Sequence, residues 1–198
     1  DFSDNENAAD LRAFLEEEGW HVQCSFMMGA SLEDIAAASE AEVNLVVSQS
    51  GMGLARTMWR RWQIPYVAGT LAGTDRRPLS HRIKTACATG VCSPVGAHFP
   101  EPGGVLVVGD QVLANSIRER LNTQYGVRGV TVGTFFGLDR ELAQPFDLDI
   151  PSEAALVELI QSRRYQVLVG DPLLQEIPGS DRLACFSVPH VAVSSKLY

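Results

Sequence analysis

A polar turn lies between two apolar segments in the first half of the chain. Ser48-Gln49-Ser50-Gly51 follows an apolar run at residues 43–47 and precedes residues 52–62, where apolar residues recur at helical spacing. This pattern predicts a buried strand, a turn and a helix. The helix would pack a wide apolar face into the core, formed by Leu54, Ala55, Met58, Trp59 and Trp62. In parallel α/β sheets, ligands bind at the carboxyl ends of strands. We therefore expect a ligand pocket lined by Ser48, Gln49, Ser50, Gly51 and Met52.

Two glycines at the start of the predicted helix, Gly51 and Gly53, bear on which ligand could bind. Without side chains there, a ligand can approach the backbone N–H groups. A dinucleotide site would need a third glycine at position 56, where the chain has Arg56. The chain also lacks the G-x-x-x-x-G-K-[ST] phosphate loop. We expect no nucleotide at this turn, and we expect Arg56 to face an anionic group of another ligand.

A second turn pattern occurs twice in the other half of the chain. V-V-G-D at 107–110 and L-V-G-D at 168–171 each predict a strand that ends at glycine and is followed by an aspartate. Each aspartate could serve only as a helix N-cap, or it could also lie at the ligand edge of a sheet. On the second interpretation, Asp110 and its neighbour Gln111 line the pocket. His190, which follows a proline near a strand end, is either a site residue or a structural histidine.

Composition excludes several classes of function. The chain of 198 residues has a net charge of −8, which argues against a nucleic-acid partner. It contains no apolar run of the roughly 20 residues that span a bilayer. Its four cysteines form no C-x-x-C pair, so the sequence predicts neither a zinc site nor a disulfide framework, and we expect a reducing, cytoplasmic location.

The charges are unevenly distributed along the chain. Residues 1–42 carry eleven acidic side chains and one basic, whereas residues 56–84 carry seven basic side chains and one acidic. Such runs are typical of solvated faces, and the basic block could alternatively bind an anion or a partner.

Predicted strands alternate with helices of about a dozen residues, a pattern typical of parallel α/β sheets. Among them, residues 20–26 alternate as a strand, and Ser31 with Asp34 forms a capping box that opens a helix. We expect two Rossmann-like α/β domains, at residues 1–98 and 105–198. Residues 99–104, rich in glycine and proline, would be the junction. The abrupt end after VPHVAVSSKLY suggests a fragment of a longer protein.

Three segments resemble the nitrogenase component 1 family: NLVVSQSGMGLARTMWRRWQIPY, VVGDQVLANSIRERL, and YQVLVGDPLL with VPHVAVSSKLY. This family holds the molybdenum–iron protein, its cofactor-assembly scaffolds and the dark-operative protochlorophyllide reductases. The resemblance covers nearly the whole chain and implies the second and third Rossmann-like domains of a subunit, without the first. It places the pocket in the cleft between the two domains, with Ser194 and Ser195 on its far side.

The resemblance also bears on metal ligands. Ser48 stands where the catalytic molybdenum–iron subunit has a cysteine ligand to the cofactor iron. Ser194 stands at or near the position of its histidine ligand to molybdenum. Serine is a poor ligand for soft iron–sulfur centres. We therefore expect no metal site and no cofactor in this fragment, and we exclude a dinitrogen-reducing catalytic subunit.

The function implied by the resemblance is that of an oxidoreductase subunit of unknown substrate, active in anaerobic metabolism. Its electrons would come from an ATP-dependent iron protein through an iron–sulfur cluster or metallocofactor held elsewhere in the full-length complex. Its partner would be a paralogous or identical component 1 subunit. No catalytic residue is assigned, and the fragment alone would be inactive. The alternative is a non-catalytic scaffold or carrier for a metallocofactor or tetrapyrrole.

The sequence makes one prediction about nucleotides. Because Arg56 replaces the third glycine and no phosphate loop exists, neither ATP nor NAD should bind tightly to the purified chain. Isothermal titration calorimetry measures this directly. Micromolar affinity for either nucleotide would contradict the interpretation of the turn.

Overall fold

The computed structural model describes residues 6–26, 29–97, 99, 101–190 and 193. The chain divides into two compact units, Asp1–Pro94 and Val95–Tyr198. Each contains a parallel sheet with helices, which confirms the predicted α/β class. In the described part of the chain, no helix has the length and apolar character that a membrane crossing requires.

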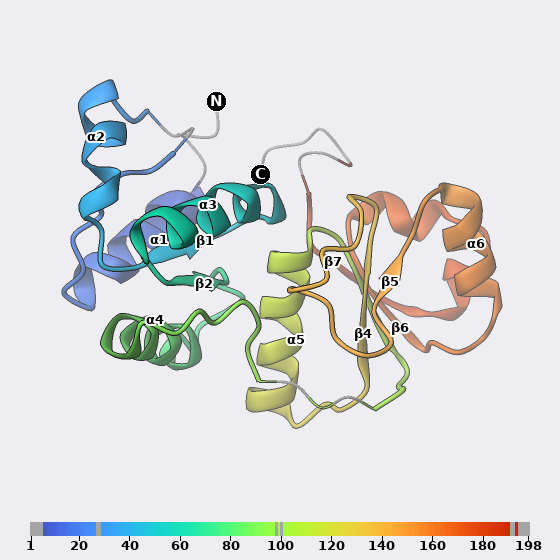
Figure 1. Cartoon of the computed structure of the whole chain (residues 1–198). Coiled ribbons are helices and arrows are strands. Elements are labelled where there is room, and N and C mark those ends of the chain that lie inside the picture. The colour runs from blue at the N-terminus through green and yellow to red at the C-terminus, as the bar shows by residue number, and fades with distance from the viewer. Residues whose placement is uncertain (1–5, 27–28, 98, 100, 191–192, 194–198) are drawn as a thin grey trace. The chain divides into compact units, whose positions relative to one another are not determined.

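The first unit is built on a small parallel sheet (Figure 1). Strand β1 (Asn44–Val46) pairs with β2 (Tyr66–Ala68), and Val67 forms a further parallel bridge with Ser93. The remaining elements are α1 (Glu6–Glu17), α2 (Leu32–Ala37), η2 (Ala38–Glu40), η3 (Gln49–Gly51), α3 (Met52–Trp62) and α4 (Arg77–Thr89), where η denotes a 3-10 helix. The predicted succession of strand, turn and helix at residues 43–62 is therefore confirmed.

The core of the first unit consists of two clusters. One joins α1 to α4 through Phe14, Val67 and Ile83. The other joins η2 to α3 and to the start of β2 through Ala38, Met58 and Ile64. A strand predicted at residues 20–26 is not formed, because that described segment pairs with no strand and instead packs Cys24 and Phe26 against the second cluster.

Much of the basic block pairs with acidic residues of the same unit. Arg76 lies 3.3 Å from Glu17 and Lys84 lies 2.6 Å from Glu18, so α4 and α1 are joined by two ion pairs. Lys84 and Ser80 both donate hydrogen bonds to Glu18 and lower the pKa of that carboxyl. This part of the charge asymmetry therefore lies at a contact between two helices.

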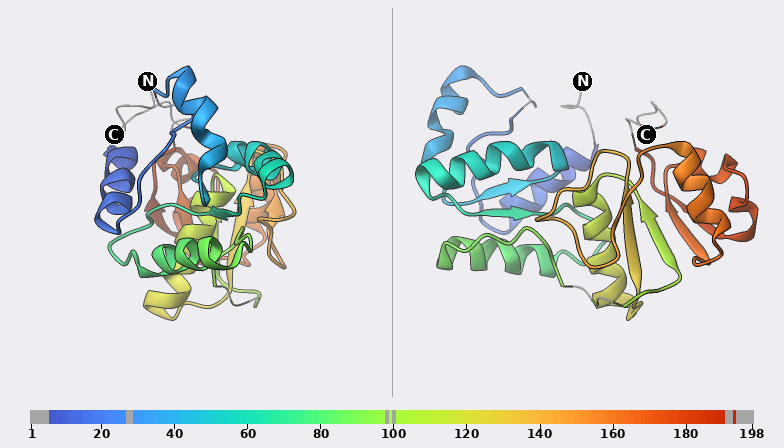
Figure 2. Two further views of the ribbon diagram at one scale, coloured as in Figure 1. Left: turned by 60° about the vertical axis from the view of Figure 1, so that its left-hand side comes forward. Right: turned by 45° about the vertical axis from the view of Figure 1, so that its right-hand side comes forward.

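The second unit is a five-stranded parallel sheet in the order β5-β4-β3-β6-β7 (Figure 2). The strands are β3 (Val105–Val108), β4 (Val130–Thr134), β5 (Leu148–Asp149), β6 (Val167–Gly170) and β7 (Ala184–Ser187). The other elements are α5 (Gln111–Tyr125), α6 (Glu153–Gln161), η4 (Pro172–Glu176) and η5 (Ser180–Arg182).

Alternate residues of these strands face two different core clusters, as strand geometry requires. Val107, Val132 and Val169 pack on the α5 side of the sheet. Leu106 and Leu168 pack on the opposite side, with α6 and η4. The four-residue apolar strands β3 and β6 therefore occupy the buried centre of the sheet.

The chain divides at residue 94, whereas the junction was predicted at residues 99–104. Gly103 packs directly on Gly129, where even a Cβ atom would lie 2.0 Å from the Gly129 carbonyl oxygen. Gly104 accepts backbone hydrogen bonds from Gln166 and Val167. These two glycines serve close packing in the second unit.

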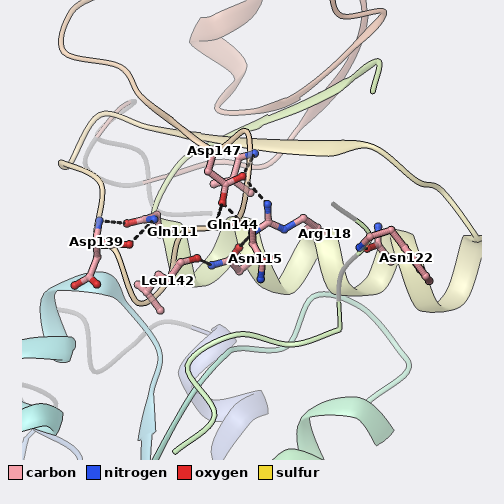
Figure 3. A network of polar contacts seen from close by, with 10 residues as sticks. Gln111, Asn115, Arg118, Asn122, Asp139, Leu142, Gln144 and Asp147 are labelled. Atoms are coloured by element: carbon pink, nitrogen blue, oxygen red, sulfur yellow. Dashed lines mark hydrogen bonds and ion pairs between the residues drawn. The ribbon is translucent and has the colours of Figure 1, made fainter. Parts of the chain in front are cut away.

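A buried ion pair fixes the long loop between β4 and β5 to helix α5 (Figure 3). Arg118 donates to both carboxylate oxygens of Asp147, at 2.5 and 3.0 Å, and the two side chains are 4% and 0% exposed. Asp147 also accepts from the backbone N–H groups of Val132 and Gln144. Four donors thus converge on one buried carboxylate, which satisfies both of its oxygens.

Replacing Asp147 with alanine should lower the free energy of unfolding by about 3–5 kcal/mol, because the Arg118 charge would remain buried and unpaired. Urea unfolding measures this change. The exposed Asp149→Ala is the matched control and should shift stability by less than about 0.5 kcal/mol. Arg118→Met/Asp147→Leu should cost less than Asp147→Ala, because it leaves no unpaired charge. Equal stability of the Asp147 and Asp149 variants would contradict this role.

Candidate functional site

The polar turn after β1 forms its own hydrogen bonds. Ser48 Oγ accepts from Ser50 N at 3.4 Å and lies 2.9 Å from Ser50 Oγ, while Gly51 N donates to the Ser48 carbonyl at 3.0 Å. These contacts form the short helix η3, from which α3 continues. Ser48 and Gln49 are half-buried and Ser50 is exposed, so the turn presents hydroxyl groups at its surface.

The two glycines of this turn have different surroundings. A Cβ atom on Gly51 would lie 3.2 Å from Val46 Cγ1, so packing against the strand favours glycine there. A Cβ atom on Gly53 would meet no atom within 4 Å, and Gly53 is exposed. Helix α3 has no side-chain cap, and Arg56 is half-buried just after its first turn. The open space therefore lies at Gly53.

Arg82, from the basic block, closes the carboxyl end of β2. Its guanidinium donates to the backbone carbonyls of Ala68 and Ser93, at 2.7 and 2.6 Å, and to Ser93 Oγ at 3.0 Å. This arginine thereby fixes the segment that bridges to Val67. Its role depends on residues 11 and 14 positions away, which the charge pattern alone did not reveal.

The second unit has a topological switch point between β3 and β6. From these neighbouring strands the chain continues to opposite edges of the sheet, and such points form ligand-binding crevices. Asp110 Oδ1 accepts from Val112 N at 2.8 Å and from Leu113 N at 3.3 Å. Asp171 Oδ1 accepts from Leu173 N at 3.0 Å. The predicted capping role of both aspartates is confirmed.

His190 lies at the edge of this crevice. Its backbone N–H donates to Asp171 Oδ2 at 2.9 Å, and its ring lies 5.3 Å from the ring of Phe136. Beneath it is a small apolar pocket. The pocket is lined by Val107, Val108, Gly109, Leu113, Ala114, Ile117, Gly170, Val188 and His190.

Two features make the edge of this pocket accessible. Phe136 is 43% exposed, and a Cβ atom on Gly109 would meet no atom within 4 Å. Sequence reasoning missed Phe136, although an aromatic residue directly after a buried strand was the available signal.

The other predicted site residues are not brought together as one group. Gln111 is fully buried, and its amide exchanges hydrogen bonds with the backbone of Asp139, so it holds the β4–β5 loop (Figure 3). Ser194 and Ser195 lie outside the described residues. The turn at Ser48 belongs to the first unit and Asp110 to the second, and their common cleft stays a prediction.

The described residues do not fit a resident metal cluster. Among them, no three histidine, cysteine, aspartate or glutamate side chains are grouped so as to hold a metal ion. Burial raises the pKa of the Cys24 and Cys185 thiols, whereas a metal ligand has to be a thiolate. Ser48 uses its hydroxyl within its own turn.

One comparison with known proteins finds a family similarity over part of this chain. Residues 1–77 match the nitrogenase component 1 type oxidoreductase family. The match covers the first unit from α1 through β2, including the Ser48 turn, and confirms the predicted resemblance there. For residues 78–198 the resemblance stays a prediction. A search of curated proteins finds no match.

Asp171 connects the end of β6 to the segment after β7, which gives a testable consequence. Asp171→Ala should lower the free energy of unfolding by about 1–3 kcal/mol, because two backbone N–H groups lose their acceptor. Asp171→Asn keeps one acceptor oxygen and should cost less. The exposed Asp181→Ala is the control. Chemical denaturation of the three variants measures the differences, and equal midpoints for all three would contradict this role of Asp171.

Proposed function

We propose that this chain is part of a nitrogenase component 1-like oxidoreductase subunit that acts on a substrate other than dinitrogen. Electrons reach it from an ATP-dependent iron protein through an iron–sulfur cluster held outside residues 1–198. It works with a paralogous or identical component 1 subunit in the cytoplasm. The observation that carries this proposal is the family match over residues 1–77, which includes the turn where the resemblance places the cofactor pocket.

The chemistry of the turn supports a bound organic or metallo-organic molecule. Ser48 and Ser50 offer hydroxyl groups, and Gly53 leaves open space at the start of α3. The positive end of the helix dipole and Arg56 favour an anionic group there. Serine in place of a thiolate disfavours a direct bond to iron. A ligand held by hydrogen bonds and charge is therefore the best fit to this turn.

The second unit has a strand-end turn of its own that we propose as a ligand-binding region. Asp110 lies at the switch point and Gln111 fixes the adjoining loop, whereas Ser194 and Ser195, which the resemblance adds to the site, lie outside the described residues. The caps of α5 and η4, at the ends of β3 and β6, are the carboxylates of Asp110 and Asp171, which repel anions. The exposed ring of Phe136, which lies beside the His190 ring, offers an aromatic surface to an uncharged part of a ligand.

Electron transfer is the first part of the proposal to test. The full-length protein should be purified without oxygen, together with its partner subunit, and mixed with the iron protein of the same source. With MgATP its iron–sulfur cluster should become reduced, as seen by electron paramagnetic resonance, and without ATP it should not. No reduction by a functional iron protein, combined with a tightly held pigment or metallocofactor, would instead support the scaffold or carrier.

A variant at Gly53 tests the pocket separately. Gly53→Trp fills open space and should leave the melting temperature nearly unchanged, while the small molecule that copurifies with the protein is lost. Mass spectrometry of the extracted molecule measures this loss. Thr85→Trp, at an exposed position on α4, is the control and should retain the molecule. Equal retention by both variants would exclude the turn from the site.

A further inference from the structure

One side of helix α5 carries a row of buried polar side chains (Figure 3). Its members are spaced three or four positions apart and so share one side of the helix: Gln111, Asn115, Arg118 and Asn122. We call these four residues the polar row. The side of α5 that packs on the sheet is apolar instead. Because buried polar groups have to be paired, the partners of the row show which segments it fixes.

The first members of the row bind the middle of the β4–β5 loop, residues 135–147. Gln111 Oε1 accepts from Asp139 N at 2.7 Å, and Gln111 Nε2 donates to the Asp139 carbonyl at 3.2 Å. Asn115 Nδ2 donates to the carbonyl of Leu142 at 2.8 Å, and Leu142 itself is fully buried. The loop is therefore attached to α5 at two successive points.

Further contacts fix both ends of the loop. At its far end Arg118 donates to Asp147, and Arg118 also donates to Asn115 Oδ1, which joins neighbouring members of the row. At its start Phe136 N donates at 3.1 Å to Oγ1 of the fully buried Thr134. Connecting loops without secondary structure are generally more mobile than the elements they join. This loop is instead held at its start, its middle and its end.

The start of the loop places Phe136 at the switch point. In the sheet β3 and β6 are neighbours, with β4 beside β3 and β7 beside β6. Phe136 follows β4 and His190 follows β7, yet their rings lie 5.3 Å apart. The two rings therefore meet across the carboxyl ends of β3 and β6. Since Phe136 is 43% exposed, part of its ring is open to a molecule that approaches this point.

We propose that the polar row positions Phe136 to bind an uncharged aromatic group of a ligand at the switch point. This inference rests on the proposed ligand-binding region of the second unit, and it names the chemical class of the group bound there. Aromatic rings pack favourably on one another. The carboxylates of Asp110 and Asp171, at the ends of β3 and β6, disfavour a negatively charged ring.

The fixed loop explains why the polar row matters for binding. A loop that is ordered before the ligand arrives loses little entropy when the ligand binds, whereas a mobile loop would have to be ordered in that step. Phe136 is then the residue that contacts the ligand. Gln111, Asn115 and Arg118 act through it and are positioning residues.

The fourth member of the row, Asn122, provides a matched control. Its Oδ1 accepts from Phe99 N at 3.1 Å, and its Nδ2 donates to the Val127 carbonyl at 2.7 Å. Asn122 is thus a buried amide with two backbone partners, as Gln111 is, but neither partner belongs to the β4–β5 loop. Gln111→Met and Asn122→Leu each remove two hydrogen bonds to the backbone. They should therefore lose comparable stability and differ in their effect on the loop.

Hydrogen–deuterium exchange of the full-length protein measures the order of the loop without any ligand. In Gln111→Met the amides of residues 135–147 should exchange at least about tenfold faster than in the wild type, because the loop loses an attachment in its middle. In Asn122→Leu these amides should exchange at the wild-type rate. Equal exchange of the loop in the two variants would overturn the positioning role of the row.

A pair of dyes tests the ligand class. The neutral dye 1-anilinonaphthalene and its 8-sulfonate share one ring system and differ in charge, so fluorescence titration should show tighter binding of the neutral dye. Phe136→Ala and Gln111→Met should each weaken binding of the neutral dye at least about fivefold. Asn122→Leu should keep the wild-type affinity. So should Tyr125→Ala, which changes an exposed ring at the other end of α5.

Several results of the dye titrations would overturn the proposal. They are the absence of saturable binding, tighter binding of the sulfonate, an unchanged affinity in Phe136→Ala, and equal losses in Gln111→Met and Asn122→Leu. The last result would mean that the row acts only through general stability. Neither the exchange nor the titration needs the iron protein, so a failure here is distinguishable from a failure of electron transfer.

Discussion

A helix that follows a parallel strand begins with backbone N–H groups that have no partner inside the helix. In this chain the preceding turn supplies the acceptors: Asp110 before α5, Asp171 before η4 and Ser48 before η3. In the second unit these acceptors are carboxylates, whose sign suits the positive end of a helix dipole. They also occupy the position that a phosphate takes in nucleotide-binding sheets. What remains open at that switch point is the apolar pocket beside His190.

In the first unit, the acceptors for the N–H groups at the helix start are uncharged. Ser48 and Ser50 are uncharged, α3 has no side-chain cap, and the next residue that carries a charge is Arg56. An anion near this turn would meet no carboxylate cap and would gain from the helix dipole. The two units thus offer different chemistry at corresponding strand ends, one tolerant of negative charge and one apolar with carboxylates behind it.

The sequence predicted features whose causes are local. The capping box at Ser31 and the cap at Asp110 depend on residues two or three positions away, and both were found. The ion pair of Arg118 with Asp147 was not found, because 29 residues separate the partners. A strand at residues 20–26 was predicted from alternation, but a strand also needs a neighbour to pair with, which a local pattern cannot supply. The Ser48 turn could be located, yet whether Gly51 or Gly53 faces open space depends on Val46 and on tertiary packing.

A local pattern also cannot show which side chains of a helix the rest of the fold will cover, and this explains why the buried face of α3 was predicted too wide. Its pattern placed Leu54, Ala55, Met58, Trp59 and Trp62 on one apolar face. Ala55 and Met58 are buried and Trp59 is half-buried, whereas Leu54 and Trp62 are exposed. A sheet of two strands is too narrow to cover so wide a face, since the second cluster extends only to Ala38, Met58 and Ile64 with Cys24 and Phe26 beside it. The acidic residues among the first 42 likewise fall into two groups, one paired and one exposed. Glu17 and Glu18 pair with α4, while the carboxylates around α2 stay exposed beside uncovered leucine and isoleucine. Helices α2 and α3 therefore both keep apolar side chains exposed, because the narrow sheet of this unit offers them no surface to pack against.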